Sequence, residues 1–119
     1  MGNYWNRTGA NEALMKQVSS IIQNKMNTVG LMGNTKEDDA LRAMLWLQRV
    51  YYDAYNNGWC KWKTDEPIYR NFQMDTAKYL RRNKIIYKGF EKLYKDEQLL
   101  EDVTNQALMC VARDLGLIK

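Results

Sequence analysis

The stretch KEDDALRAMLWLQRVYYDAYN, residues 36–56, sets the fold class of this 119-residue chain. Its apolar residues recur at helical spacing but cover more than one narrow stripe. They are Leu41, Met44, Leu45, Leu47, Val50, Tyr51, Tyr52 and Tyr55. A helix that is apolar on several sides needs neighbours on several sides. We therefore expect a central helix over residues 36–56, with other helices packed around it.

Both ends of this helix carry boundary signals. Thr35, with Asp38 three residues later, resembles a capping box, and the acidic run 37–39 suits the positive end of a helix. Gly58 follows the last helical residues and suits the left-handed turn after a helix. The pattern predicts a sharp start and a sharp end.

Upstream, Asn11 is expected to cap a first helix that ends near Gly30. Its apolar positions are Leu14, Val18, Ile21, Ile22 and Met26. Downstream, Asp65 is expected to cap a third helix, with Pro67 in its first turn, where the missing N–H costs nothing. The buried side of that helix is predicted to consist of Ile68, Phe72, Thr76, Tyr79 and Leu80.

The C-terminal third contains two more helical patterns. Residues 84–95 have helical spacing, although Gly89 weakens such a helix by about 1 kcal/mol relative to alanine. Asp96 is expected to start a last helix that Gly116 closes. Its apolar face would contain Leu100, Val103, Ala107, Cys110, Val111 and Leu115.

These patterns predict an all-α protein, a single compact bundle of four to five helices. The length favours one domain over residues 1–119, with residues 1–9 set apart as a flexible N-terminal segment. No apolar run approaches the length of a membrane helix, and the first residues have no signal-peptide core. We expect a cytoplasmic protein with no membrane partner.

The charge is distributed unevenly along the chain. Residues 61–95 contain ten Lys/Arg against four acidic residues, a net charge of +6, whereas the rest of the chain has a net charge of −2. Aromatic residues are interleaved with these cations. A basic segment of this kind is typical of a surface that binds nucleic acid or an acidic protein surface.

We expect a partner-binding face made by this segment. Trp59 and Trp62, in a predicted ordered loop, are the candidate anchors, because large rings are enriched at binding hot spots. The candidate partner-binding residues are Trp59, Lys61, Trp62, Lys63, Arg81, Arg82, Lys84 and Lys88. The alternative is an ordinary solvated surface, with Tyr69, Phe72, Tyr79, Phe90 and Tyr94 in the core.

Residues 76–92 also resemble a DNA-binding helix-turn-helix. Leu80 would pack the first helix, Asn83 would lie near the turn, and Tyr87 and Phe90 would anchor the recognition helix. Lys84, Lys88 and Lys92 would then face DNA at helical spacing. The turn lacks its usual glycine, and Arg82 stands where an apolar residue is preferred.

The sequence contains few of the groups and motifs that enzymes use for catalysis. The chain contains no histidine, the commonest general acid–base group and metal ligand, and neither a phosphate-binding loop nor a dinucleotide fingerprint. The acidic residues 37–39 and 101–102 could hold Mg²⁺ if two helix starts met, but acids at these places are typical of helix N-termini. Cys60 and Cys110 are expected to be free thiols.

We therefore expect no enzyme, no cofactor and no metal. The expected function is non-catalytic binding that modulates or inhibits a larger macromolecular, even nucleoprotein, assembly, in the manner of small accessory proteins of phages or mobile elements. The partner would be a protein or nucleoprotein with an acidic surface. The alternative function is that of a helix-turn-helix-like DNA-binding regulator over residues 76–92.

Overall fold

A computed structural model describes residues 9–31, 33–56 and 67–119, and this part of the chain contains five helices and no strand. In chain order they are α1 (Gly9–Thr28), α2 (Lys36–Asn56), α3 (Pro67–Arg82), α4 (Phe90–Lys95) and α5 (Glu97–Asp114). The radius of gyration, 13.3 Å, is close to the value of about 13.5 Å expected for a compact chain of this length. The all-α bundle predicted from sequence is confirmed.

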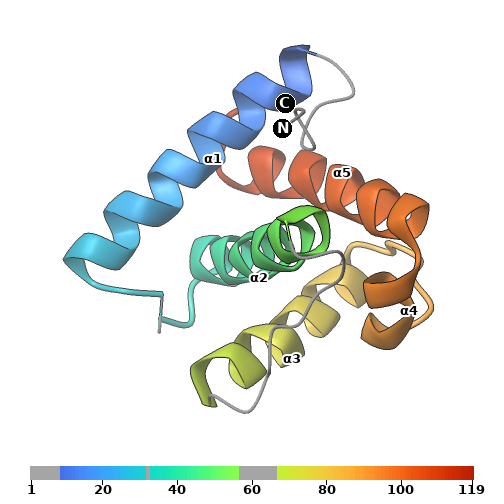
Figure 1. The fold of residues 1–119 in the computed structure, drawn as a ribbon. Coiled ribbons are helices and arrows are strands. Elements are labelled where there is room, and N and C mark those ends of the chain that lie inside the picture. Colours follow the sequence, from blue (N-terminus) through green and yellow to red (C-terminus); the bar gives the residue numbers. More distant parts are fainter. Residues whose placement is uncertain (1–8, 32, 57–66) are drawn as a thin grey trace.

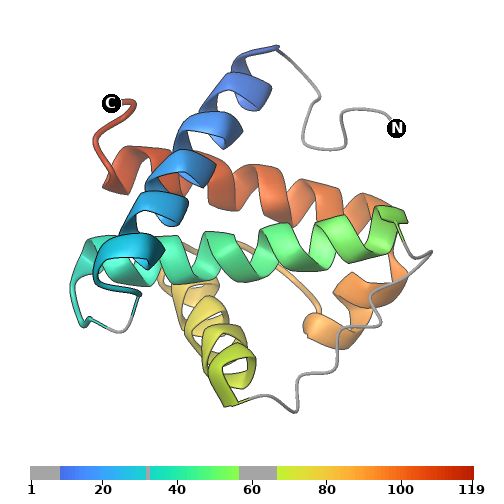
Figure 2. The same ribbon diagram turned by 60° about the vertical axis from the view of Figure 1, so that its left-hand side comes forward.

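Helix α2 lies at the centre of the bundle, between α1, α3 and α5 (Figure 1). Figure 2 shows α2 and α5 lying side by side, and they run in opposite directions, since Lys36 at the start of α2 is paired with Asp114 at the end of α5. The buried residues of α2 face several neighbours: Ala40, Leu41, Ala43, Met44, Trp46, Leu47, Val50 and Tyr51. The central position and the bounds 36–56 are both as predicted.

The turn before α2 is held by its cap and by a glycine. Thr35 Oγ1 accepts a hydrogen bond from the Asp38 N–H at 3.0 Å, as the capping pattern predicts. The Asp38 carboxylate is paired with Lys25 of α1 at 3.3 Å, and this ion pair joins the two helices. A Cβ atom at Gly33 would collide with that carboxylate, so the turn needs a residue without a side chain.

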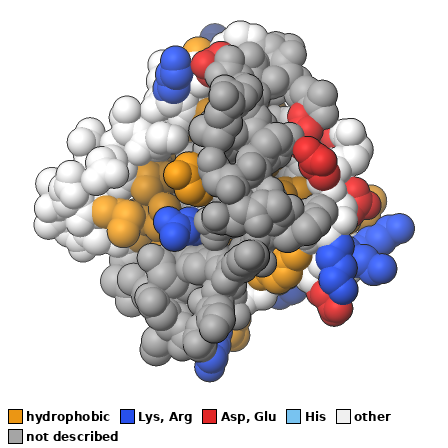
Figure 3. Space-filling view, in the orientation of Figure 1, with side chains coloured by type: hydrophobic (Ala, Val, Ile, Leu, Met, Phe, Trp, Pro, Cys, Tyr) orange, Lys and Arg blue, Asp and Glu red, His pale blue; other side chains and the backbone are white. Residues whose placement is uncertain are grey.

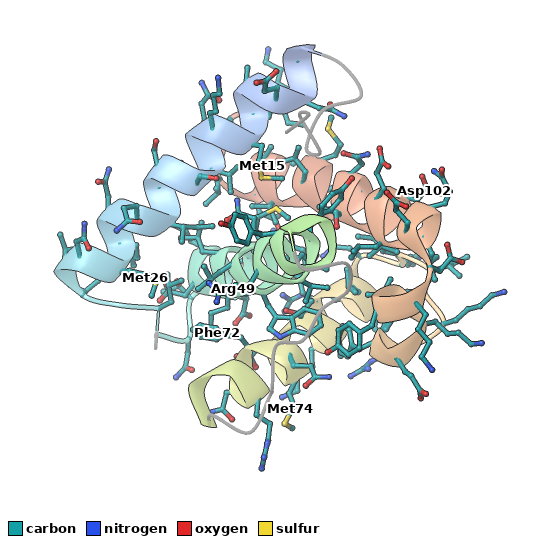
Figure 4. The ribbon with its side chains drawn as sticks, viewed as in Figure 1. Met15, Met26, Arg49, Phe72, Met74 and Asp102 are labelled. Atoms are coloured by element: carbon teal, nitrogen blue, oxygen red, sulfur yellow. The ribbon has the colours of Figure 1, made fainter. Side chains whose placement is uncertain are left out.

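Helix α1 is attached to the bundle through one narrow face. Met15, Val18 and Ile22 are its only buried residues, and Figure 4 shows Met15 between α1 and α5. Gln48 of α2 adds a hydrogen bond to Ser19 Oγ at 2.8 Å. The helix begins at Gly9, so the predicted cap at Asn11 is wrong, and Met26, predicted to be buried, is 43% exposed.

The predicted helix over residues 84–95 is shorter than expected. Helix α4 begins only at Phe90, and residues 83–89 are not helical. The reason is the way α3 ends: the Lys84 N–H bonds to the Arg81 carbonyl at 3.0 Å, and the Ile85 N–H bonds to the Leu80 carbonyl at 2.9 Å. This pair of bonds is a Schellman motif, which turns the chain away from the helix axis.

Aromatic packing holds α4 against the centre of the bundle. The Phe90 ring lies 4.5 Å from the fully buried Trp46 ring in an edge-on arrangement, and the Tyr94 ring lies 6.2 Å from it. Phe72 and Tyr79 of α3 are also buried. Core packing, the alternative interpretation of these aromatic residues, is therefore confirmed for Phe72 and Tyr79, whereas Phe90 and Tyr94 are half-buried and Tyr69 lies outside the described side chains.

Helix α5 has the predicted start and end. The Asp96 carboxylate accepts a hydrogen bond from the Leu99 N–H at 3.0 Å. At the other end, Gly116 has a φ of 77°, and the Leu117 N–H bonds to the Ala112 carbonyl at 2.8 Å, which lets Leu117 pack back on the core. Of the predicted apolar face, Leu100, Val103, Ala107 and Val111 are buried, and Cys110 and Leu115 are partly buried.

Candidate interaction surface

Three helix ends meet at one corner of the bundle. The last turn of α3 lies beside the start of α2 and the end of α5, as the contacts of Arg82 with Asp39 and of Asn83 with Arg113 require. Each of these ends contributes positive charge. We call this group the basic corner, made up of Lys36, Arg81, Arg82, Lys84 and Arg113.

Asp114 lies at the centre of the basic corner. Its side chain is only 4% exposed and accepts a hydrogen bond from the Tyr79 hydroxyl at 2.7 Å. Lys36 Nζ lies 3.6 Å and Arg113 Nε 3.8 Å from its other oxygen. Arg113 also donates to Asn83 Oδ1 at 3.0 Å. One buried carboxylate thus holds cations from the first turn of α2 and the last turn of α5 at the end of α3.

The Tyr79 hydroxyl stays protonated at neutral pH. Burial raises the pKa of Tyr79 well above its usual value, and the hydrogen bond to Asp114 and that residue's negative charge raise it further. The hydroxyl therefore acts as a fixed donor to the Asp114 carboxylate. It positions the corner and cannot serve as a base.

The cations of the basic corner remain largely exposed. Arg82 is about half exposed, lies 3.5 Å from Asp39 and stacks over the Tyr79 ring at 5.5 Å. The five cations outnumber the two carboxylates that contact them, those of Asp39 and Asp114, and Glu37 of the first turn of α2 lies next to Lys36 in the sequence. Exposed ion pairs at such distances are weak, so the cations can exchange their contacts for a partner's acidic groups.

The structure brings together three of the predicted partner-binding residues. Arg81, Arg82 and Lys84 belong to the basic corner, and Lys88 follows on the segment that leads to α4. The other predicted residues, Trp59, Lys61, Trp62 and Lys63, lie outside the described residues. Sequence reasoning missed Lys36 and Arg113, which join the corner only because α2 and α5 are antiparallel.

The segment from Lys84 to Lys88 alternates between inward and outward side chains. Ile85 is 6% exposed, whereas Ile86 is 84% exposed. The Tyr87 ring turns back to lie 5.3 Å from the Phe90 ring, and Lys88 is exposed again. Lys84, Ile86 and Lys88 thus share the outer side of a non-helical segment, which we call the outer ridge.

The predicted recognition helix is wrong. Lys84 and Lys88 precede α4, so they do not share a helical face with Lys92. Tyr87 and Phe90 do anchor the segment to the core, as expected, but they anchor a loop. A helix-turn-helix needs a second helix directly after the turn, and the short α4 begins too late to provide it.

The basic segment is also divided in space. Figure 3 shows Lys and Arg side chains gathered over α4, which contains Lys92 and Lys95. Helix α4 adjoins the start of α5, whereas the basic corner lies at the end of α5, a helix of 18 residues that spans about 27 Å. The lysines of α4 and the basic corner are therefore two separate groups.

A second arginine, Arg42, is buried close to the basic corner. It donates to the carbonyl oxygens of Leu31 at 2.7 Å and Gly33 at 2.6 Å, and its Nε lies 2.9 Å from Asp75 of α3. It also pairs with Asp39. Through these contacts Arg42 joins the α1–α2 turn, α2 and α3.

A hollow of about 270 Å³ lies above Arg42, between the α1–α2 turn and α3. Its lining is part apolar and part polar: Leu31, Gly33, Asn34, Arg42, Asn71, Phe72, Met74, Asp75 and Lys78. In Figure 4 Phe72 lies between α3 and α2, whereas Met74 points away from the bundle. Met74 is 56% exposed.

The two acidic groups considered for a metal site do not meet. Asp38 and Asp39 face Lys25, Arg42 and Arg82 at the start of α2, and Glu101 and Asp102 lie near the start of the antiparallel α5. Within the described ranges, no group of three candidate metal ligands is present. Cys110 is a free thiol, as predicted, and Cys60 lies outside the described residues.

Comparison with known protein families, curated proteins and solved structures finds no match for this chain. None of the helices in the described part of the chain is long and apolar enough to cross a membrane.

Proposed function

We propose that this protein is a non-catalytic binding protein that docks on an acidic surface of a larger macromolecular assembly and modulates or inhibits that assembly. The docking surface is the basic corner together with Lys88. The protein acts by occupying its partner's surface, and it transforms no substrate. We place it in the cytoplasm.

The convergence of cations from three helix ends is the observation that carries this proposal. Lys36, Arg82 and Arg113 are far apart in the sequence, yet ion pairs, a hydrogen bond and a cation–π contact that involve Asp39, Tyr79 and Asp114 connect them. A fixed cluster of exposed cations raises the rate of encounter with an acidic partner and disfavours basic ones.

The chemistry of the corner favours binding over catalysis. The chain contains no imidazole to accept a proton near neutral pH. The high pKa of the Tyr79 hydroxyl keeps it protonated, and the Asp114 carboxylate is already held by a hydroxyl and two cations. Groups that are engaged in this way position one another, and they leave no nucleophile or base free for a substrate.

Charge reversal tests the proposal. The double variant Lys36→Glu/Arg82→Glu changes the charge of the basic corner, and the matched control Lys16→Glu/Lys95→Glu makes the same change at exposed lysines on α1 and α4. Each tagged protein would be used for affinity isolation from a lysate of the source organism at low and moderate salt. We expect the wild type and the control to retain a partner that the corner variant loses.

Folding and the class of partner need separate controls. Circular dichroism and thermal unfolding would establish that both double variants keep the helical fold. Treatment of the lysate with nuclease separates the two classes of partner, because a protein partner persists and a nucleic acid does not. Retention of the partner by the corner variant, or recovery of nucleic acid alone, would contradict the proposal.

A further inference from the structure

The outer ridge presents one isoleucine between two lysines on a segment that is anchored at both ends. We propose that Ile86 is an apolar plug that enters a pocket on a protein partner, while Lys84 and Lys88 pair with acidic residues at the rim of that pocket. This inference rests on the proposed function and adds the chemistry of the partner: an apolar pocket surrounded by carboxylates.

The ridge is held by its inward-facing neighbours. Ile85, on one side of Ile86, is buried and follows the Schellman motif that ends α3, and its N–H bonds to the Leu80 carbonyl at 2.9 Å. Tyr87, on the other side, packs on Phe90, which in turn packs on Trp46. Ile86 is therefore displayed from a framework in which both adjacent residues are fixed.

The exposure of Ile86 is unusual for its residue type. At 84%, it is the most exposed of the large hydrophobic side chains in the described part of the chain. Isoleucine is branched at Cβ and has few rotamers, so immobilising it in a pocket costs little conformational entropy. A rigid apolar side chain on a fixed segment is preorganised for binding, whereas a solvated loop position would favour a polar residue.

The backbone at Lys84 is strained in a way that favours the same interpretation. Its φ of 59° is left-handed, and it is the only positive φ among the described residues that are not glycine. Gly116 occupies the equivalent position after α5. A lysine stands here where glycine is the ordinary choice, and we take its side chain to have a role in binding.

The geometry favours a protein partner over a nucleic acid. Unpaired bases are bound by stacking on exposed rings, but the rings of Tyr87 and Phe90 turn inward to each other and to Trp46. The outward position between the lysines is aliphatic.

Selection of folded binders tests the ridge with a defined probe. A displayed library of small folded domains with a randomised concave surface would be selected on the full-length wild-type protein, and an enriched domain would be purified for titration. We expect enriched domains to present apolar residues surrounded by Asp or Glu. Ile86→Ser should weaken binding by about tenfold or more, the loss that is typical of a hot-spot anchor.

Variants of the two lysines and of a remote valine serve as comparisons for Ile86→Ser. Lys84→Gln/Lys88→Gln should weaken binding most at low salt, because the interaction is electrostatic. Val29→Ser removes a side chain that is 73% exposed in the turn after α1 and should leave binding unchanged. No enrichment of domains with an acidic–apolar surface, or equal binding by the Ile86→Ser variant, would overturn the inference.

Binding of the isolated partner by the ridge variant and by the corner variant distinguishes this inference from the proposed function. If the Ile86→Ser variant retains that partner while Lys36→Glu/Arg82→Glu loses it, the corner binds and the ridge does not. If neither set of variants affects the partner, the proposed function itself fails. Loss of the partner by both sets supports both proposals.

Discussion

Arg42 and Arg82 come from different helices and reach the same carboxylate, that of Asp39, yet their surroundings differ completely. The Arg42 side chain is 8% exposed and has four different partners in one turn and two helices. The Arg82 side chain is 53% exposed, and its contacts are Asp39 at 3.5 Å and the face of the Tyr79 ring. Arg42 is buried and stabilises the fold, whereas Arg82 is half-exposed to solvent.

The comparison shows why a count of basic residues is a poor guide to a binding surface. A buried guanidinium group must have its charge and all its donors satisfied, so its removal leaves unpaired groups behind. An exposed guanidinium group is solvated before and after its removal. We therefore expect the same residue type to contribute to stability at one site and, under the proposed function, to binding at the other, although the two sites are connected through one aspartate.

The largest expected effect follows from removing the buried arginine. Arg42→Met fills a similar volume but leaves the carbonyls of Leu31 and Gly33 without their donor and separates Asp75 from its ion-pair partner. We expect a loss of about 3 kcal/mol in the free energy of unfolding, measured by urea denaturation, and a fall of about 10 °C in Tm. A loss below about 1 kcal/mol would show that the two arginines do not differ as described.

Tyr79 connects the two regions, and its removal should have an intermediate effect. Tyr79→Phe removes the hydrogen bond to Asp114 and should cost about 1.5 kcal/mol in the free energy of unfolding. Because the folded state raises the pKa of Tyr79, its contribution is complete below the usual tyrosine pKa near 10 and is lost as the pH rises above it. The difference between wild type and variant should therefore shrink above pH 10, and a constant difference would contradict this assignment.

The two Schellman motifs allow a smaller, matched test. Lys84→Gly relieves the crowding of Cβ at a positive φ but adds chain entropy to the unfolded state, so we expect a net stabilisation of about 0.5 kcal/mol. Gly116→Ala, where an added Cβ meets no atom within 4 Å, should destabilise by about 1 kcal/mol through the backbone alone. Thermal unfolding measures both. Destabilisation by Lys84→Gly would show that its side chain stabilises the fold.

The smallest effect is expected at the exposed arginine. Arg82→Gln should change the free energy of unfolding by less than about 0.5 kcal/mol, because its weak ion pair is replaced by water. The same variant should weaken partner binding. A stability loss comparable to that of Arg42→Met would remove the distinction between the two sites.

The sequence predicted the helices whose ends have local signals. Helix α2 was predicted with its observed bounds, and the Asp96 cap and the Gly116 turn were also predicted, because each depends on residues within a few positions. The predicted helix over residues 84–95 was wrong because tertiary packing overrides the local pattern. Ile85 packs into the core after a left-handed lysine, and no propensity rule expects a lysine there.

The candidate site was only partly predictable. Arg81, Arg82, Lys84 and Lys88 are adjacent in the sequence, so the charge run identified them. Lys36 and Arg113 join them only through the antiparallel pairing of α2 and α5, and Ile86 was predicted to lie on a helix. The burial of Arg42 could not be predicted from the sequence either, because its partners include two backbone carbonyls of a turn.

The narrow attachment of α1 has a consequence for the order in which the native state opens. Only Met15, Val18 and Ile22 are buried on this helix, whereas α2 is enclosed by neighbours on several sides. We expect detachment of α1 to expose fewer buried apolar side chains than unfolding of α2 and to leave the rest of the bundle assembled. In hydrogen–deuterium exchange, the amides of α1 should lose their protection through a sub-global opening, well before those of α2, which exchange only when the whole molecule unfolds.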